Sequence, residues 1–189
     1  MAVDPPPEVG AELAAWARGV AGRSGAEPPR GTRGTLRVLE ASSLHLTLCF
    51  LGGRPVGEIE ALAAALGARR EHVCELSVGA PVSLPPRRPR ALAVEIRDRT
   101  GELLRLHEEV AGALARVSTW EPSRRRLRAH ITVARTRADD RGVPALHQLP
   151  PTPQLSFTPR AVVLYRSWLA PAGATYEAVA SCDLLPDAG

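Results

Sequence analysis

The sequence predicts an α+β protein. Three segments carry apolar residues at helical spacing, at residues 7–22, 55–66 and 100–117. Shorter strand-like segments lie between them, and several neighbouring strands read as antiparallel, which argues against a doubly wound parallel sheet. A chain of 189 residues fits one domain, or two small lobes that share a core.

The first half of the chain reads as helix, strand, strand, helix. Asp4 and Pro5–Pro7 mark the start of the first helix, which is predicted to end near Gly22. Residues 23–34 are rich in Gly, Pro and Arg and are predicted to form a loop, followed by a short strand at 36–39. The second helix is predicted to begin at Pro55.

The second half is predicted to contain most of the strands. Strand patterns at 73–79 and 91–96 flank the loop Pro85–Arg90, and Thr100 is predicted to cap the third helix. Residues 136–154 read as mostly irregular. Strand patterns at 161–168 and 175–182 are predicted to form a hairpin around Pro171–Gly173.

Residues 44–50, L-H-L-T-L-C-F, have a regular strand alternation with two polar residues on one face. Four apolar side chains, including Phe50, share one parity and are predicted to face the core. His45 and Thr47 share the other parity, so an imidazole and a hydroxyl point the same way, roughly 6.5–7 Å apart. On its own this arrangement is typical of the solvent face of a half-buried strand.

A second stretch repeats the pattern. In R-A-H-I-T-V-A-R, residues 128–135, His130 and Thr132 again share one face of an alternating strand. One such H-x-T carries little weight, but two in matched strand contexts indicate a functional pair. His72, His107 and His147 have no such context and are interpreted as structural or surface residues.

Two histidines and two threonines suit phosphoryl transfer. Imidazoles with a pKa near 6.5 can divide the work at neutral pH, one as a neutral base and one as a protonated acid. Threonine hydroxyls can donate to phosphate oxygens as charge builds on phosphorus. The same set is a poor zinc site, with no Asp or Glu beside either motif on that face, so no metal or other cofactor is expected.

Composition narrows the class further. All 24 basic residues are arginine and the net charge is +4, which favours anionic partners, although GC-rich codon usage would produce the same bias. No apolar run approaches the roughly 18–20 residues of a membrane span, and the first residues do not resemble a secretory signal, so a cytoplasmic protein is expected. Three widely spaced cysteines, Cys49, Cys74 and Cys182, are predicted to be reduced thiols.

The two motifs also resemble a known family. H-L-T-L-C-F-L-G (residues 45–52) and H-I-T-V-A-R (residues 130–135) are similar to the paired motifs of the two-histidine (2H) phosphoesterase superfamily. The best resemblance is to its bacterial branch, the RNA 2′,3′-cyclic phosphodiesterases, also called 2′-5′ RNA ligases. A-V-D-P-P-P-E-V, P-R-R-P-R-A-L-A-V and L-Y-R-S-W-L-A-P-A-G-A-T-Y resemble further segments of that branch, in the correct order.

The resemblance implies a single bilobal domain over residues 1–189, with two antiparallel sheets lining a central cleft and helices outside. It implies that His45 is the general acid and His130 the general base, while Thr47 and Thr132 bind phosphate oxygens. The implied reaction is metal-independent hydrolysis of an RNA terminal 2′,3′-cyclic phosphate to a 2′-phosphomonoester. The implied partners are RNA ends of that kind or small cyclic nucleotides, with no membrane, and the protein is expected to be a monomer.

The sequence departs from the family pattern at the first strand and at Cys49, and a substrate contact by Arg135 depends on the local shape of the strand. Met1 falls where related chains are already several residues into the first strand, so either the start is late or this edge strand is clipped. Cys49 stands where the family often has a basic residue. Arg135 has the parity opposite to His130, so a substrate contact requires the strand to end or bulge there; a structural salt bridge is the alternative.

The basic runs at 87–90 and 124–126 are either a rim that follows the RNA or solvated surface. Tyr165 and Phe50 are candidates for base stacking, although the parity of Phe50 places it in the core. Three other activities also remain: 2′-5′ RNA joining, hydrolysis of small cyclic nucleotides or an ADP-ribose cyclic phosphate, and RNA-end binding without catalysis.

Overall fold

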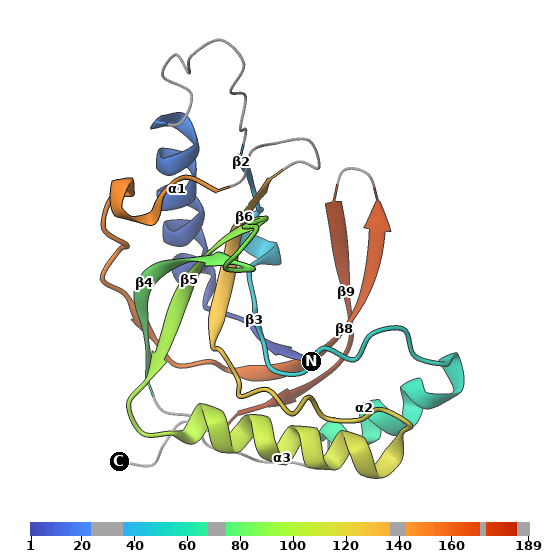
Figure 1. The fold of residues 1–189 in the computed structure, drawn as a ribbon. Helices are drawn as coiled ribbons and strands as arrows, with labels where there is room; N and C mark the ends of the chain where they lie inside the picture. The colour runs from blue at the N-terminus through green and yellow to red at the C-terminus, as the bar shows by residue number, and fades with distance from the viewer. Residues whose placement is uncertain (24–35, 68–74, 137–142, 171–172, 185–189) are drawn as a thin grey trace.

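The computed structural model describes residues 1–23, 36–67, 75–136, 143–170 and 173–184. Figure 1 shows the three helices and the strands of this part of the chain. The helices are α1 (Pro7–Arg23), α2 (Ile59–Gly67) and α3 (Glu102–Val117). The strands are β1 (Ala2–Val3), β2 (Leu36–Val38), β3 (Leu46–Thr47), β4 (Leu76–Leu84), β5 (Ala91–Asp98), β6 (His130–Thr136), β7 (Ser156–Phe157), β8 (Ala161–Ala170) and β9 (Gly173–Asp183).

Every strand pair is antiparallel, which confirms the predicted α+β class. The strand order is β7-β4-β5-β6-β3-β1-β8-β9. β2 lies off this path and pairs with the C-terminal half of β6. β6 therefore has β5 along one edge and β3 and β2, one after the other, along the opposite edge. The prediction that the first strand is an edge strand is wrong, because the two residues of β1 lie between β3 and β8 and join the two halves of the sheet.

The helices lie outside the curled sheet (Figure 1). α1 packs near β2 and β6, whereas α2 packs against α3 and against the β8–β9 hairpin. Most of each predicted stripe is buried, for example Leu13 in α1, Leu62 in α2 and Leu114 in α3, whereas Val117 at the end of α3 is 39% exposed. Within the described residues no helix is long and apolar enough to cross a membrane.

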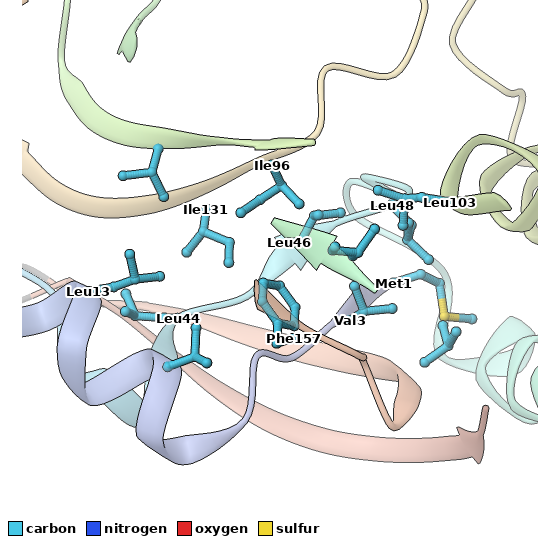
Figure 2. Packing of buried hydrophobic residues seen from close by; sticks show 14 of the residues in the cluster. Met1, Val3, Leu13, Leu44, Leu46, Leu48, Ile96, Leu103, Ile131 and Phe157 are labelled. Atoms are coloured by element: carbon cyan, nitrogen blue, oxygen red, sulfur yellow. The ribbon is translucent and has the colours of Figure 1, made fainter. Parts of the chain in front are cut away.

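Figure 2 shows buried apolar residues that pack together, among them Leu44, Leu46 and Leu48 of the first motif. Leu44, Leu46 and Leu48 are at most 4% exposed, in agreement with their parity. Phe50 is 82% exposed, so its prediction as a core residue is wrong. The alternation ends because the amides of Leu48 and Cys49, two successive residues, both donate to the carbonyl of Met1, and pairing of this irregular kind disrupts the ladder.

Asp98 accepts most of the hydrogen bonds at the start of α3, and the predicted cap Thr100 accepts one, from the amide of Glu102 at 3.4 Å. One carboxylate oxygen of Asp98 accepts hydrogen bonds from the amides of Thr100 and Gly101, and the other accepts from the amide of Leu103. Gly101 has φ 82°, a left-handed conformation that favours glycine. The cap therefore belongs to the last residue of β5, and residues 99–101 lie between it and the helix.

The other elements follow the predictions closely. β8 and β9 form the predicted hairpin, and the loop at 85–90 separates β4 from β5 as predicted. β4 starts at Leu76 and runs to Leu84, five residues beyond the predicted end at 79. Residues 73–74, His72 and the predicted loop at 24–34 lie outside the described residues.

Candidate active site

One pair of residues brings the two motifs together. Leu46 of β3 and Ile131 of β6 are partners in the antiparallel ladder. Continuing that register places His45 opposite Thr132 and Thr47 opposite His130, so the two motifs are related by a local twofold arrangement. Cross-strand neighbours have Cβ atoms about 4.5–5.5 Å apart. Four polar side chains from sites 85 residues apart therefore form one compact group.

These four residues line an open cavity of about 560 Å³. Its walls come from both halves of the sheet: β2, β3 and β6 on one side, and the β8–β9 hairpin on the other. Five further lining residues carry polar or aromatic groups that bear on chemistry: Arg37, Phe50, Arg135, Tyr165 and Tyr176. The structure thus places all the predicted site residues around a single cavity.

Both histidines are held in the same way by the backbone. His45 Nδ1 lies 2.9 Å from the carbonyl of Ser43, and His130 Nδ1 lies 2.6 Å from the carbonyl of Arg128. Because a carbonyl only accepts, each Nδ1 carries a proton and donates it. Nε2 is therefore the ring nitrogen available for proton exchange, as a base in the neutral ring and an acid in the charged one.

His45 lies among aromatic rings. The ring of Tyr176 meets it edge-on with centroids 4.7 Å apart, and the ring of Tyr165 lies at 5.9 Å. Burial lowers the pKa of His45 below its ordinary value of 6.5; the Ser43 carbonyl and the charge of Asp4 oppose this, while the charge of Arg135 adds to it. His45 is therefore a stronger acid than a free imidazole, and an anion in the cavity would raise its pKa again.

A bulge in β6 turns Arg135 toward the cavity. Thr132 pairs with Ala93 and Ala134 pairs with Leu92, so Val133 is an extra residue without a partner position on β5. A bulge of this kind shifts the alternation by one residue. Arg135 consequently lies on the cavity side with His130 and Thr132. In a regular strand its side chain would point to the opposite face, so the bulge is what makes a substrate contact by Arg135 feasible.

The two basic runs lie elsewhere. Arg87 and Arg88 are exposed on the β4–β5 loop, and Arg124–Arg126 are exposed before β6. Arg126 lines a second cavity of about 370 Å³ over β4 and β5, which His130 also borders. Neither run lines the cavity that holds the four motif residues.

Of the other described histidines and cysteines, Cys49 lines the cavity, whereas His107, His147 and Cys182 do not. His107 Nδ1 lies 3.8 Å from the Sγ of Cys49, and burial raises the pKa of that thiol to about 11. His147 lies in a short 3₁₀ helix (Leu146–Gln148). Within the described ranges, no three His, Cys, Asp or Glu side chains are grouped as a metal site would require.

Sequence reasoning missed Arg37 and Tyr176. Tyr176 faces Ser167 across the β8–β9 hairpin, whose register shifts between Leu164 and Tyr165. Both residues lie in segments of correctly predicted strand, but nothing in their local pattern shows which face borders a cavity. One local signal was present: Tyr165 and Ser167 are polar residues two apart, so they share one face of their strand and mark it as the face toward the cavity.

Comparison with known proteins agrees with this geometry. A family model described as the 2′-5′ RNA ligase superfamily matches residues 5–168. No curated protein matches the chain. E. coli LigT complexed with 3′-AMP is 24% identical with a TM-score of 0.74, over 97% of this chain and 95% of that chain. The protein TT0787 of Thermus thermophilus is 27% identical with a TM-score of 0.71, over 98% and 97% of the two chains.

The structural likeness to LigT extends across both halves of the sheet and supports the fold. The family model adds the sequence relationship, since it spans both H-x-T motifs and most of the chain. This protein therefore belongs to the 2′-5′ RNA ligase superfamily, the two-histidine phosphoesterases.

Proposed function

We propose that this protein opens the terminal 2′,3′-cyclic phosphate of RNA to a 2′-phosphomonoester without a metal ion. The observation that carries the proposal is the Leu46–Ile131 pair, which sets two histidines and two threonines around one cavity. Two imidazoles provide both proton transfers that an in-line displacement at phosphorus requires.

In the proposed step, both proton transfers use Nε2 of a motif histidine. His130 Nε2 takes a proton from water as the water oxygen bonds to phosphorus. The bond from phosphorus to O3′ breaks, and His45 Nε2 donates a proton to O3′. The phosphate then remains on O2′, and each histidine has exchanged its protonation state.

Thr47 and Thr132 are proposed to stabilise the reacting phosphate. Each hydroxyl can donate to a non-bridging oxygen, and the two threonines lie on neighbouring strands, each opposite a histidine when the Leu46–Ile131 register is continued. Arg135 is proposed to supply positive charge at the same cavity. Donors of this kind, held in place before the reaction, act where charge develops.

The rim of the cavity suits a nucleoside. Phe50 is 82% exposed yet lines the cavity, and the indole of Trp120 donates to its carbonyl at 3.1 Å, which holds this segment in place. Exposed aromatic rings at such a rim suit base stacking. LigT, which shares the fold, has been crystallised with 3′-AMP, ATP and NADP+, and these complexes support a nucleotide substrate here.

The decisive experiment is product analysis on a short RNA that ends in a 2′,3′-cyclic phosphate, incubated with the protein in EDTA. The expected product is the 2′-phosphate alone, with the same rate in EDTA as in magnesium. A 3′-phosphate product, or loss of activity in EDTA, would contradict the mechanism.

A further inference from the structure

Residues 50–58 connect the first motif to α2 and form one rim of the cavity. Phe50, Leu51 and Gly52 line that cavity. The regular part of the segment is a 3₁₀ helix at Val56–Glu58, and Gly52 has φ 67°, a left-handed conformation that favours glycine. A rim with so little secondary structure of its own takes its position from contacts made outside it.

These contacts come from Thr119 and Trp120, which follow the end of α3. The indole Nε1 of Trp120 donates to the carbonyl of Phe50 at 3.1 Å, across 70 residues of sequence. The amide and the hydroxyl of Thr119 both donate to one carboxylate oxygen of Glu58, at 3.2 and 2.8 Å. Two successive residues therefore hold the segment at both of its ends.

The supporting residues are themselves well anchored. Trp120 is partly buried and packs against the hydrophobic core. Its amide donates to the hydroxyl of Ser118, which in turn donates to the carbonyl of Leu114 in the last turn of α3. The guanidinium of Arg54 also donates to the hydroxyl of Thr119, at 3.2 Å. The rim is thus fastened to a helix that packs on the core.

The ring of Phe50 needs this support because it has little of its own. The side chain is 82% exposed, so burial does not fix it at the rim. A ring that is free to move must be ordered when it binds a base, and that ordering reduces affinity. A backbone held in place before binding reduces this cost, which is the role that the hydrogen bond from Trp120 suits.

We propose that Trp120 is a positioning residue: through the Phe50 carbonyl it holds the ring of Phe50 where that ring stacks on the base of the terminal nucleotide. Thr119 secures the other end of the same segment through Glu58. This inference rests on the proposed function and deepens it, because recognition of the base then depends on two residues that do not line the cavity.

Titration of two ligands without turnover tests the inference: adenosine 2′-phosphate, which carries a base, and inorganic phosphate, which does not. Trp120→Phe keeps an aromatic ring and removes the indole N–H. It is expected to weaken adenosine 2′-phosphate binding about 3- to 10-fold, the usual effect of one hydrogen bond, and to leave phosphate binding unchanged. Phe50→Ala is expected to weaken adenosine 2′-phosphate binding about 5- to 100-fold, the range of stacking on one base.

The double variant separates positioning from a general structural role. In the Phe50→Ala background, Trp120→Phe is expected to cause no further loss, because the ring that it positions is gone. Trp16→Phe is the matched control: its indole also donates to a backbone carbonyl, that of Pro151 at 3.0 Å, and Trp16 does not line the cavity. This control is expected to keep both affinities at the wild-type values.

Thr119→Val is a second variant, which decides the question if Trp120→Phe does not fold. Valine keeps the branched shape and removes the hydroxyl, so adenosine 2′-phosphate binding is again expected to weaken while phosphate binding does not. On a short RNA that ends in a 2′,3′-cyclic phosphate, both variants are expected to raise KM and to retain kcat.

Three results would overturn the inference: equal losses for the two ligands, a loss in Trp120→Phe that persists in full when Phe50 is alanine, or a wild type that binds adenosine 2′-phosphate no more tightly than phosphate. Since no titration involves turnover, the binding results stand even if the cyclic phosphate is not opened. Additive losses in a protein that does open it would refute the positioning role alone.

Discussion

The hydroxyl of Tyr165 donates a hydrogen bond of 2.5 Å to Oδ2 of Asp4. This contact joins β8 to the segment before α1, across 161 residues of sequence. Burial, together with the Asp4 carboxylate, raises the pKa of Tyr165, so its hydroxyl stays protonated and remains a donor. The same carboxylate raises the pKa of His45, against the larger effect of burial.

Asp4→Asn is expected to lower the pKa of His45 further, because the mutation removes the one carboxylate charge that opposes burial. In the proposed mechanism His45 must be protonated, so the limb of the rate profile on which activity falls with rising pH moves to lower pH. The measurement is kcat/KM from pH 5 to 9 on a short RNA that ends in a 2′,3′-cyclic phosphate. Glu8→Gln, an exposed acidic position on α1, is the control and leaves that limb in place.

His45→Ala and His130→Ala are each expected to lower the rate about 10²- to 10⁴-fold, the usual contribution of a positioned acid or base. Both side chains are only partly buried, so the folded state is expected to persist, as circular dichroism would show. His147→Ala, in the 3₁₀ helix away from the cavity, should retain the wild-type rate. Full activity in either motif variant would refute the assignment.

Phe50→Ala and Leu48→Ala separate the two faces of the first motif. Leu48 is 4% exposed, so its truncation is expected to cost about 2–5 kcal/mol of unfolding free energy. Phe50 is exposed at the rim, so its truncation is expected to change stability little and to raise KM for an RNA that ends in a 2′,3′-cyclic phosphate. Urea unfolding measures the stability of both variants, and steady-state kinetics measure their KM. A large loss of stability in Phe50→Ala would contradict the exposed position of this side chain.

The motif residues were predictable because the side-chain alternation of a strand is local. His45 and Thr47 share a face for the same reason as His130 and Thr132, and both pairs line the cavity. That the two strands lie side by side depends on the Leu46–Ile131 pair, which no local pattern contains. The repeat of the motif suggested that both strands contribute to one site, but it did not show how the two strands pair.

Two positions in the motifs depend on irregular points of the ladder. Phe50 was assigned by an alternation that stops after Leu48, and the direction of Arg135 depends on the extra residue Val133. Bulges arise from long-range pairing, so a one-strand pattern cannot locate them. Arg37 illustrates the same limit, since its strand was predicted but its partner was not.

The cap of α3 provides a last prediction, on stability and pH. Burial alone would raise the pKa of Asp98, but its hydrogen bonds with Thr100, Gly101 and Leu103 together outweigh burial and lower it. A carboxylate with a lowered pKa stabilises the fold above its ordinary value of 3.8, and this stabilisation is lost as the pH falls through the lower folded value.

Asp98→Ala is therefore expected to cost about 1 kcal/mol of unfolding free energy at pH 7, the typical loss of a helix cap. Thr100→Ala removes two bonds of its hydroxyl, one donated to Asp98 and one accepted from the amide of Glu102. It leaves the three backbone amides that donate to Asp98 in place, so its loss is expected to be smaller. Thermal unfolding at pH 7 and near pH 3 compares the two variants with the wild type. The gap between the wild type and Asp98→Ala should narrow at the acidic pH, because protonation weakens the same hydrogen bonds. An equal gap at both pH values, or a larger loss in Thr100→Ala, would show that Asp98 does not hold the start of α3.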